Sequence, residues 1–144
     1  MLSLTEEHDI VYREDPIPGA VVQKEVCTPS QAEFSREVTP SSVMLFRYSA
    51  LTFNGHRIHY DADYARDIEG YDGLVFHGPL TATLLADMAL SQIHKPISKF
   101  DYRGHVPLAG LKPFQIEGRH AEGGMELCAR RHDGAIAMSA SARF

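Results

Sequence analysis

The chain has 144 residues, of which 44% are hydrophobic and 23% charged, so length and composition predict one globular domain spanning residues 1–144. Its 19 acidic residues outnumber 14 basic ones, and a formal net charge of −5 argues against nucleic acid as a partner. No run approaches the roughly 20 apolar residues that a membrane-spanning helix needs, so we expect no membrane partner.

The amino terminus, residues 1–20, is predicted to form one strand and a connector. Residues 8–13 are the strand candidate, and the proline-rich run that follows breaks regular structure. The first ten residues lack the basic segment and long apolar core of a secretory signal. Two cysteines, Cys27 and Cys128, make no disulfide framework, so we expect a reducing, cytoplasmic location.

Two helices are predicted next. Thr39 and Pro40 are typical of a helix start, and apolar residues at helical spacing continue from 41 to about 51. A short helical turn is expected at 61–65. The stronger helix, at about 79–94, carries leucine, alanine and methionine around most of its circumference. A helix that is apolar nearly all round must be buried.

Strands dominate the rest of the pattern, with candidates at 74–76, 98–106, 114–120, 125–131 and 135–144. Turn signals at 122–124 and 133–134 join the last three strands into an antiparallel meander. One buried helix and such a sheet predict an α+β domain, with the antiparallel sheet wrapped around the long central helix. The open edge strands of such a sheet favour pairing between subunits.

The segment just after the first predicted helix concentrates polar and titratable side chains, namely Asn54, His56, Arg57, His59 and Asp61. Histidine exchanges protons near neutral pH, and asparagine can hold a water or a carbonyl group. A structural role for His59, bonded to a backbone carbonyl, and a turn role for Asn54 both remain open. His56 and His59 have a spacing that suits a metal pair, but no cysteine lies near, so no metal is expected.

A second candidate feature lies where the strand candidate at 74–76 meets the long helix. The first N–H groups of a helix have no internal partner, and its dipole is positive at that end. Gly78 lets a ligand approach the backbone closely. This turn is therefore a candidate for stabilising a developing oxyanion.

Two runs closely resemble the MaoC-like hot-dog hydratases and dehydratases: Phe46-Arg-Tyr-Ser-Ala-Leu-Thr-Phe-Asn-Gly-His-Arg-Ile-His-Tyr-Asp61 and Gly73-Leu-Val-Phe-His-Gly-Pro-Leu80. The nearest branch holds 3-hydroxyacyl-thioester dehydratase and the mesaconyl- and itaconyl-CoA hydratases, and Tyr102–Leu108 resembles it too. The resemblance runs from about residue 20 to the end of the chain. It implies a hot-dog fold and a hydro-lyase of fatty acid metabolism. Such an enzyme reversibly hydrates an enoyl thioester of CoA or acyl carrier protein, without a cofactor.

The resemblance also implies roles for individual residues. The family pattern of an aspartate, four residues and a catalytic histidine falls on Asn54 and His59, so asparagine replaces the aspartate. The family's Asn-Pro pair is replaced by His56-Arg57. His59 is then the general base and acid, Asn54 holds the water or the β-hydroxyl, and the Gly78 amide binds the thioester oxygen. Substrate contacts are expected from His56, Arg57, Tyr71 and His77.

Some members of this branch carry two hot-dog domains, and residues 6–14 resemble the closing strand of a first one. The chain would then be a catalytic half that forms a homodimer or pairs with a second hot-dog half. Two other functions stay open. A hot-dog thioesterase would need a carboxylate near the helix start, and the first acid after Gly78 is Asp87, well inside the helix. A non-catalytic acyl-thioester-binding subunit would be compatible with asparagine at position 54.

Overall fold

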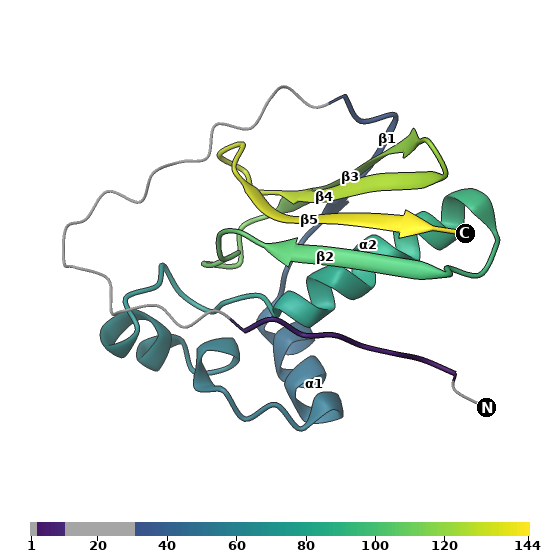
Figure 1. Ribbon diagram of the computed structural model, residues 1–144. Helices are drawn as coiled ribbons and strands as arrows, with labels where there is room; N and C mark the ends of the chain where they lie inside the picture. Colours follow the sequence, from purple (N-terminus) through teal and green to yellow (C-terminus); the bar gives the residue numbers. More distant parts are fainter. Residues whose placement is uncertain (1–2, 11–30) are drawn as a thin grey trace.

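The computed structural model describes residues 3–10 and 31–144 (Figure 1). Residues 3–10 contain no helix or strand, and the rest of the expected amino-terminal strand and connector lies outside the described residues, as does Cys27. The elements in chain order are β1 Phe34–Val38, α1 Ser42–Thr52, a 3-10 turn Arg57–His59, a π-helical turn Tyr64–Ile68, α2 Gly78–Ile93, β2 Lys99–Gly104, β3 Phe114–Ala121, β4 Gly124–Arg130 and β5 Ile136–Arg143.

Five strands form one sheet in the order β1-β3-β4-β5-β2, and every neighbouring pair is antiparallel. The predicted meander of the last three strands, β3 to β5, is confirmed. β1 was not predicted, because three exposed polar residues separate its two apolar ends. It is fixed by tertiary contact: Phe34 lies opposite Gly118, where an added Cβ would stand only 2.3 Å from the phenyl ring.

The strand predicted at residues 74–76 is wrong. This segment makes one isolated bridge, Val75 to Ala109, supported by a 2.7 Å hydrogen bond from the Phe76 N–H to the Leu108 carbonyl. Its partner segment then turns away, because Gly110 and Leu111 take left-handed φ values of 79° and 54°. The two segments therefore cannot continue as paired strands beyond this single bridge.

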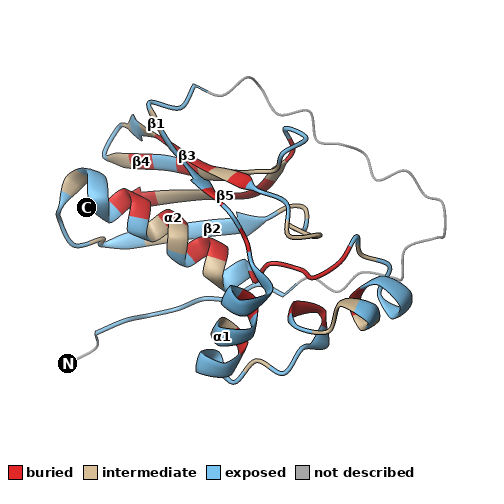
Figure 2. Ribbon diagram, turned by 180° about the vertical axis from the view of Figure 1, so that it is seen from behind, coloured by how far each residue is buried: buried red, intermediate tan, exposed pale blue. Residues whose placement is uncertain are grey.

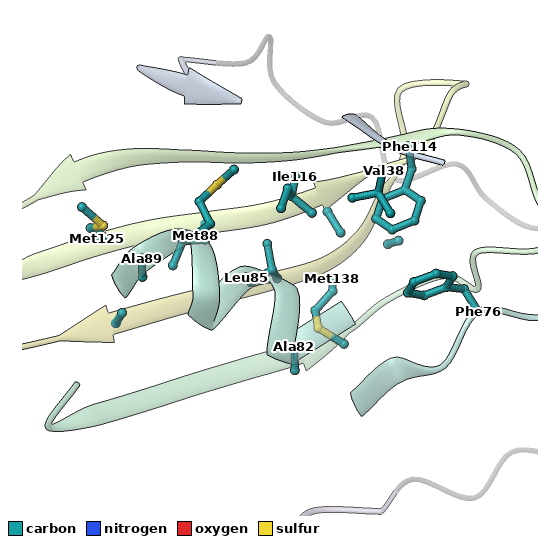
Figure 3. Close-up of a cluster of buried hydrophobic side chains, with 14 of the residues drawn as sticks. Val38, Phe76, Ala82, Leu85, Met88, Ala89, Phe114, Ile116, Met125 and Met138 are labelled. Atoms are coloured by element: carbon teal, nitrogen blue, oxygen red, sulfur yellow. The ribbon is translucent and has the colours of Figure 1, made fainter. Parts of the chain in front are cut away.

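α2 crosses one face of the sheet and contacts β3, β4, β5 and β2 (Figure 1). Its inward side chains, with Leu85 at the centre, pack against apolar residues of the strands such as Ile116 and Met138 (Figure 3). The prediction of a helix buried all round is wrong, because the sheet covers only one side. Leu90 is 41% exposed, and Figure 2 shows exposed turns along α2. None of the helices in the described residues is long and apolar enough to span a bilayer.

Replacing Leu85 with alanine is expected to lower the free energy of unfolding by about 3 kcal/mol, because its fully buried side chain leaves a cavity between α2 and the sheet. Leu90→Ala removes the same atoms from a partly exposed position of α2, and we expect a loss below about 1 kcal/mol. Urea denaturation of the two variants measures the difference. Equal losses would contradict the packing described for α2.

Candidate active site

The end of α1 sets the geometry of the polar segment. α1 terminates at Phe53, which adopts a left-handed φ of 53° and whose side chain is 96% exposed. The next amide, of Asn54, donates to the Ser49 carbonyl at 2.9 Å. The Asn54 side-chain oxygen then accepts the His56 N–H at 3.0 Å, which forms a local turn. This turn leads directly into the 3-10 turn that carries His59.

His59 is held as a neutral base. Its ring is buried, with 7% of the residue exposed, and its Nδ1 lies 2.7 Å from the Val75 carbonyl oxygen. Since a carbonyl oxygen only accepts, Nδ1 carries the hydrogen and Nε2 keeps its lone pair. Burial lowers the pKa of His59 below its ordinary value of 6.5, although the hydrogen bond to Val75 opposes this effect. His59 is thus unprotonated at neutral pH.

Two further histidines surround His59. The His77 ring stacks on it, with the ring centroids 3.7 Å apart and the planes inclined by 17°. The exposed His56 presents its ring edge-to-face at 5.7 Å. His77 itself is 0% exposed, so it lies behind His59 and not on the molecular surface. It also immediately precedes α2, which connects His59 to the start of that helix.

The amino terminus of α2 presents backbone donors. None of the described side chains caps it. Pro79 has no N–H, and the Thr81 N–H already donates to the His77 carbonyl at 3.0 Å, so the donors at this end are the amides of Gly78 and Leu80. A Cβ added to Gly78 would meet no atom within 4 Å. The space beside this residue is therefore open to a ligand.

Arg57 and Tyr71 have structural partners. Both Nε and Nη2 of Arg57 donate to the Asp61 carboxylate, and the guanidinium lies 4.2 Å from the centroid of the Tyr64 ring. The hydrogen bond to Asp61 raises the pKa of Arg57, so the guanidinium keeps its charge. Tyr71 packs against a small cluster under the 3-10 turn, formed by Ile58, Ala65 and Val75.

A cavity of about 160 Å³ lies between three loop regions and is lined by Tyr71, Asp72, Lys112, Arg131 and His132 among others. Its lining includes none of His59, Asn54 and Gly78. Within the described parts of the chain, three or more His, Cys, Asp or Glu side chains nowhere gather as a metal-binding group would.

Sequence reasoning missed two groups that hold His59 and His77. The first is the Val75 carbonyl, which comes from a segment 16 residues away, so no local pattern could reveal it. The second is Ser49, whose Oγ lies 2.9 Å from Nε2 of His77. A signal for Ser49 did exist: it lies four residues after the buried Leu45, on the inner face of α1.

Comparison with known proteins identifies the family of the chain. The family model for hydroxyacyl-thioester dehydratase type 2 matches residues 1–110. The chain is 45% identical to mesaconyl-C(4)-CoA hydratase of Chloroflexus aurantiacus, over 98% of this chain and 50% of that protein. It is 34% identical to the mitochondrial hydroxyacyl-thioester dehydratase type 2 of Schizosaccharomyces pombe, over 76% of this chain and 40% of that protein. The chain thus spans about half the length, or less, of these curated relatives.

Solved structures share the fold. A MaoC-like dehydratase from Phytophthora capsici superposes with a TM-score of 0.68 at 15% identity, over 87% of this chain and 44% of that one. A chain of the ChsH1-ChsH2 complex from Mycobacterium tuberculosis gives 0.62 at 14% identity, over 75% of this chain and 89% of that one. The predicted α+β hot-dog fold is confirmed.

Proposed function

Because this chain belongs to the hydroxyacyl-thioester dehydratase type 2 family, we propose that it adds water reversibly to an α,β-unsaturated acyl thioester. One observation carries the proposal. His59, a neutral base, stacks on His77, and the next residue, Gly78, begins the uncapped end of α2. A proton-transferring group and an oxyanion-stabilising backbone thus meet in one site, which is what this reaction needs.

In the hydration direction, His59 Nε2 accepts a proton from water as the water oxygen bonds to the β-carbon of the enoyl group. The electron pair of the double bond moves toward the thioester, whose oxygen becomes enolate-like. The Gly78 and Leu80 amides, at the positive end of the α2 dipole, stabilise that charge. His59 then returns the proton to the α-carbon, and dehydration follows the same steps in reverse.

Asn54 is assigned to holding the water or the β-hydroxyl, because its side-chain amide has donor capacity beyond the bond that its oxygen accepts from His56. It cannot act as a base, so His59 carries both proton transfers. His56 lies beside His59 and is a candidate for substrate contact. His77 lies behind His59 with no exposed surface, whereas the Arg57 side chain is 56% exposed and its guanidinium is held by the ion pair with Asp61. Substrate contacts by these two residues stay predictions.

A hot-dog thioesterase is less compatible with this site. Hydrolysis of the thioester would need a carboxylate near the start of α2 to activate water or attack the carbonyl. The first acidic residue of α2, Asp87, is exposed and forms a 3.2 Å ion pair with Arg36 of β1. This contact directs Asp87 toward the sheet edge.

The decisive assay follows the ultraviolet absorbance of the enoyl thioester. Purified protein is incubated with crotonyl-CoA and with mesaconyl-C(4)-CoA, the thioester named in one relative. Loss of the enoyl band without release of free thiol supports a hydratase, and the faster substrate indicates the acyl group. Thiol release would instead support a thioesterase. Binding of both esters without either change would contradict a catalytic role for this chain in the state tested.

The rate should fall in acid because only unprotonated His59 accepts a proton. Burial lowers the pKa of His59, so the midpoint of the acid limb of kcat/KM is expected below 6.5. Above pH 7 the profile should be level, and below the midpoint it should drop about tenfold per pH unit. Initial rates in a series of buffers at constant ionic strength measure this profile. A midpoint above 7 would contradict the assignment of His59 as a buried base.

We also propose that a second hot-dog domain covers α1 and the sheet edge at β2. The outer face of α1 exposes Val43, Phe46 and Leu51, and Phe53 follows at its end. Figure 2 shows α1 as largely exposed. β2 is an edge strand and exposes Tyr102. The curated relatives are about twice as long, which leaves room in them for a second domain. We take the covering domain here to be a second copy of this chain or a second hot-dog half.

Light scattering of the purified chain tests this proposal. A dimer would support pairing between two copies, and a monomer that dimerises only when a non-catalytic half is coexpressed would support the second form. A monomer in both preparations would contradict both.

A cytoplasmic location is a separate proposal, based on cysteine usage. Because a fungal relative is named mitochondrial, cell fractionation is the test.

A further inference from the structure

One buried histidine transfers no proton in the reaction proposed above. His77 is completely buried, its Nε2 lies 2.9 Å from the Ser49 hydroxyl of α1, and its Nδ1 has no hydrogen-bond partner within the described residues. Burying an imidazole with one nitrogen unsatisfied is unfavourable, and an apolar side chain would fill the same space without that loss. The position therefore calls for a reason beyond packing.

The surroundings of His77 point to His59. The two rings are stacked at 3.7 Å, and Tyr48 of α1 contacts the His77 ring edge-on at 4.7 Å. The side chains facing the pair are Tyr48 and Ser49 from α1 and His56 from the loop, and the Val75 carbonyl binds His59 from the segment before α2. No described carboxylate or lysine hydrogen-bonds to either ring.

His77 is suited to remain neutral throughout the reaction. Burial lowers the pKa of His77 to about 4, and the neighbouring His59 contributes a smaller part of this effect. Since the Nδ1 atom has no acceptor, the hydrogen belongs on Nε2 and is donated to the Ser49 Oγ. A neutral ring can stay stacked on His59 both before and after His59 gains a proton, whereas a second cation would be repelled.

We propose that His77 is a positioning residue: Ser49 fixes the His77 ring, and His77 in turn fixes the plane of the His59 ring and keeps water from its stacked face. The proposal rests on the proposed function, because it assigns His77 a role in presenting the base of that reaction. It differs from simple packing in one respect: the Ser49 hydroxyl must control the titration and reactivity of His59, although its hydrogen bond is to His77.

The test compares Ser49→Ala with Ser49→Thr, which keeps the hydroxyl, in the full chain. Nuclear magnetic resonance titration of the His59 imidazole, without substrate, reports its pKa directly. In Ser49→Ala the His77 ring loses its anchor, water reaches His59, and the pKa of His59 should rise toward 6.5. We expect kcat to fall about tenfold, a small part of the roughly 100- to 10,000-fold that a positioned base contributes, with KM unchanged within about twofold. Ser49→Thr should restore both values.

Ser139→Ala is the matched control, because Ser139 Oγ makes an equivalent 2.8 Å hydrogen bond to His105 Nε2 in the sheet. It should alter neither the His59 titration nor kcat. His77→Phe keeps an aromatic ring of similar size but cannot bond to Ser49, so it should raise the pKa of His59 and lower kcat as Ser49→Ala does. The proposal is overturned if Ser49→Ala titrates and turns over as wild type, if Ser139→Ala shifts the His59 titration and kcat as Ser49→Ala does, or if a folded His77→Phe keeps the wild-type pKa of His59 and the wild-type kcat.

The titration and the activity assay together distinguish failure of the proposed function from failure of the positioning role. If wild-type protein hydrates no thioester, the proposed function fails, but the titration of His59 still reports whether Ser49 and His77 control it. If wild-type protein is active and His59 is indifferent to Ser49, only the positioning role fails.

Discussion

Replacing His59 with alanine is expected to lower kcat/KM for hydration about a thousandfold, within the roughly 100- to 10,000-fold range of a positioned general acid–base group. The loss is large because Asn54 cannot take over proton transfer, and His77 is buried behind the stack with a pKa of about 4. His56 is the nearest other imidazole, but its ring lies on the exposed side and is not fixed by the Val75 carbonyl.

The measurement is the enoyl absorbance assay on His59→Ala and on the more nearly isosteric His59→Asn. His120→Ala is the control, because His120 is an exposed histidine of β3 paired with Glu33. It should keep wild-type kcat/KM within about twofold. Thermal unfolding should show all three variants folded, so that lost activity reports chemistry. Near wild-type turnover by folded His59→Ala would rule out His59 as the proton-transferring group.

Replacing Gly78 with alanine is expected to lower kcat/KM about 10- to 100-fold without destabilising the protein. The added methyl group would meet no protein atom within 4 Å, and alanine is the better helix former at the start of α2. Stability should therefore stay level or rise slightly. The same methyl group would occupy the open space through which a thioester oxygen must approach the Gly78 amide, and loss of one oxyanion donor costs roughly 100- to 1,000-fold in other enzymes.

Gly104→Ala is the matched control, since a Cβ at Gly104 of β2 likewise meets nothing within 4 Å and this residue lies away from the start of α2. Parallel measurements of kcat/KM and of the thermal midpoint distinguish the two effects. Unchanged turnover in Gly78→Ala would show that no ligand approaches this amide. A fall in the thermal midpoint would instead mean that Gly78 has a packing role that the open space does not indicate.

The sequence by itself determined the type and order of the longer helices and strands from α1 onward, apart from the strand expected at 74–76. The 3-10 turn Arg57–His59 was not predicted. Local signals carried this information: the apolar runs predicted α1 and α2, and the turn residues at 122–124 and 133–134 defined the meander. The predicted cap of α1 was wrong by two residues, because Ser41, and not Thr39, accepts the Met44 N–H. The candidate pair of His59 and Gly78 was also predicted, because both lie in short segments whose residue types are unusual for a surface loop.

Only the tertiary structure decided how these residues act together. β1 depends on the fit of Phe34 over Gly118, and the exposed apolar face of α1 depends on which side the sheet leaves uncovered. The tautomer of His59 is set by the Val75 carbonyl, 16 residues later in the chain. The His59 ring stacks on the ring of His77, and His77 is hydrogen-bonded to Ser49, 28 residues before it. Such contacts join segments that share no local pattern. These contacts form only after folding has brought the distant segments together, at the entropic cost of closing the chain between them. They therefore stabilise the folded state but leave no local pattern in the sequence.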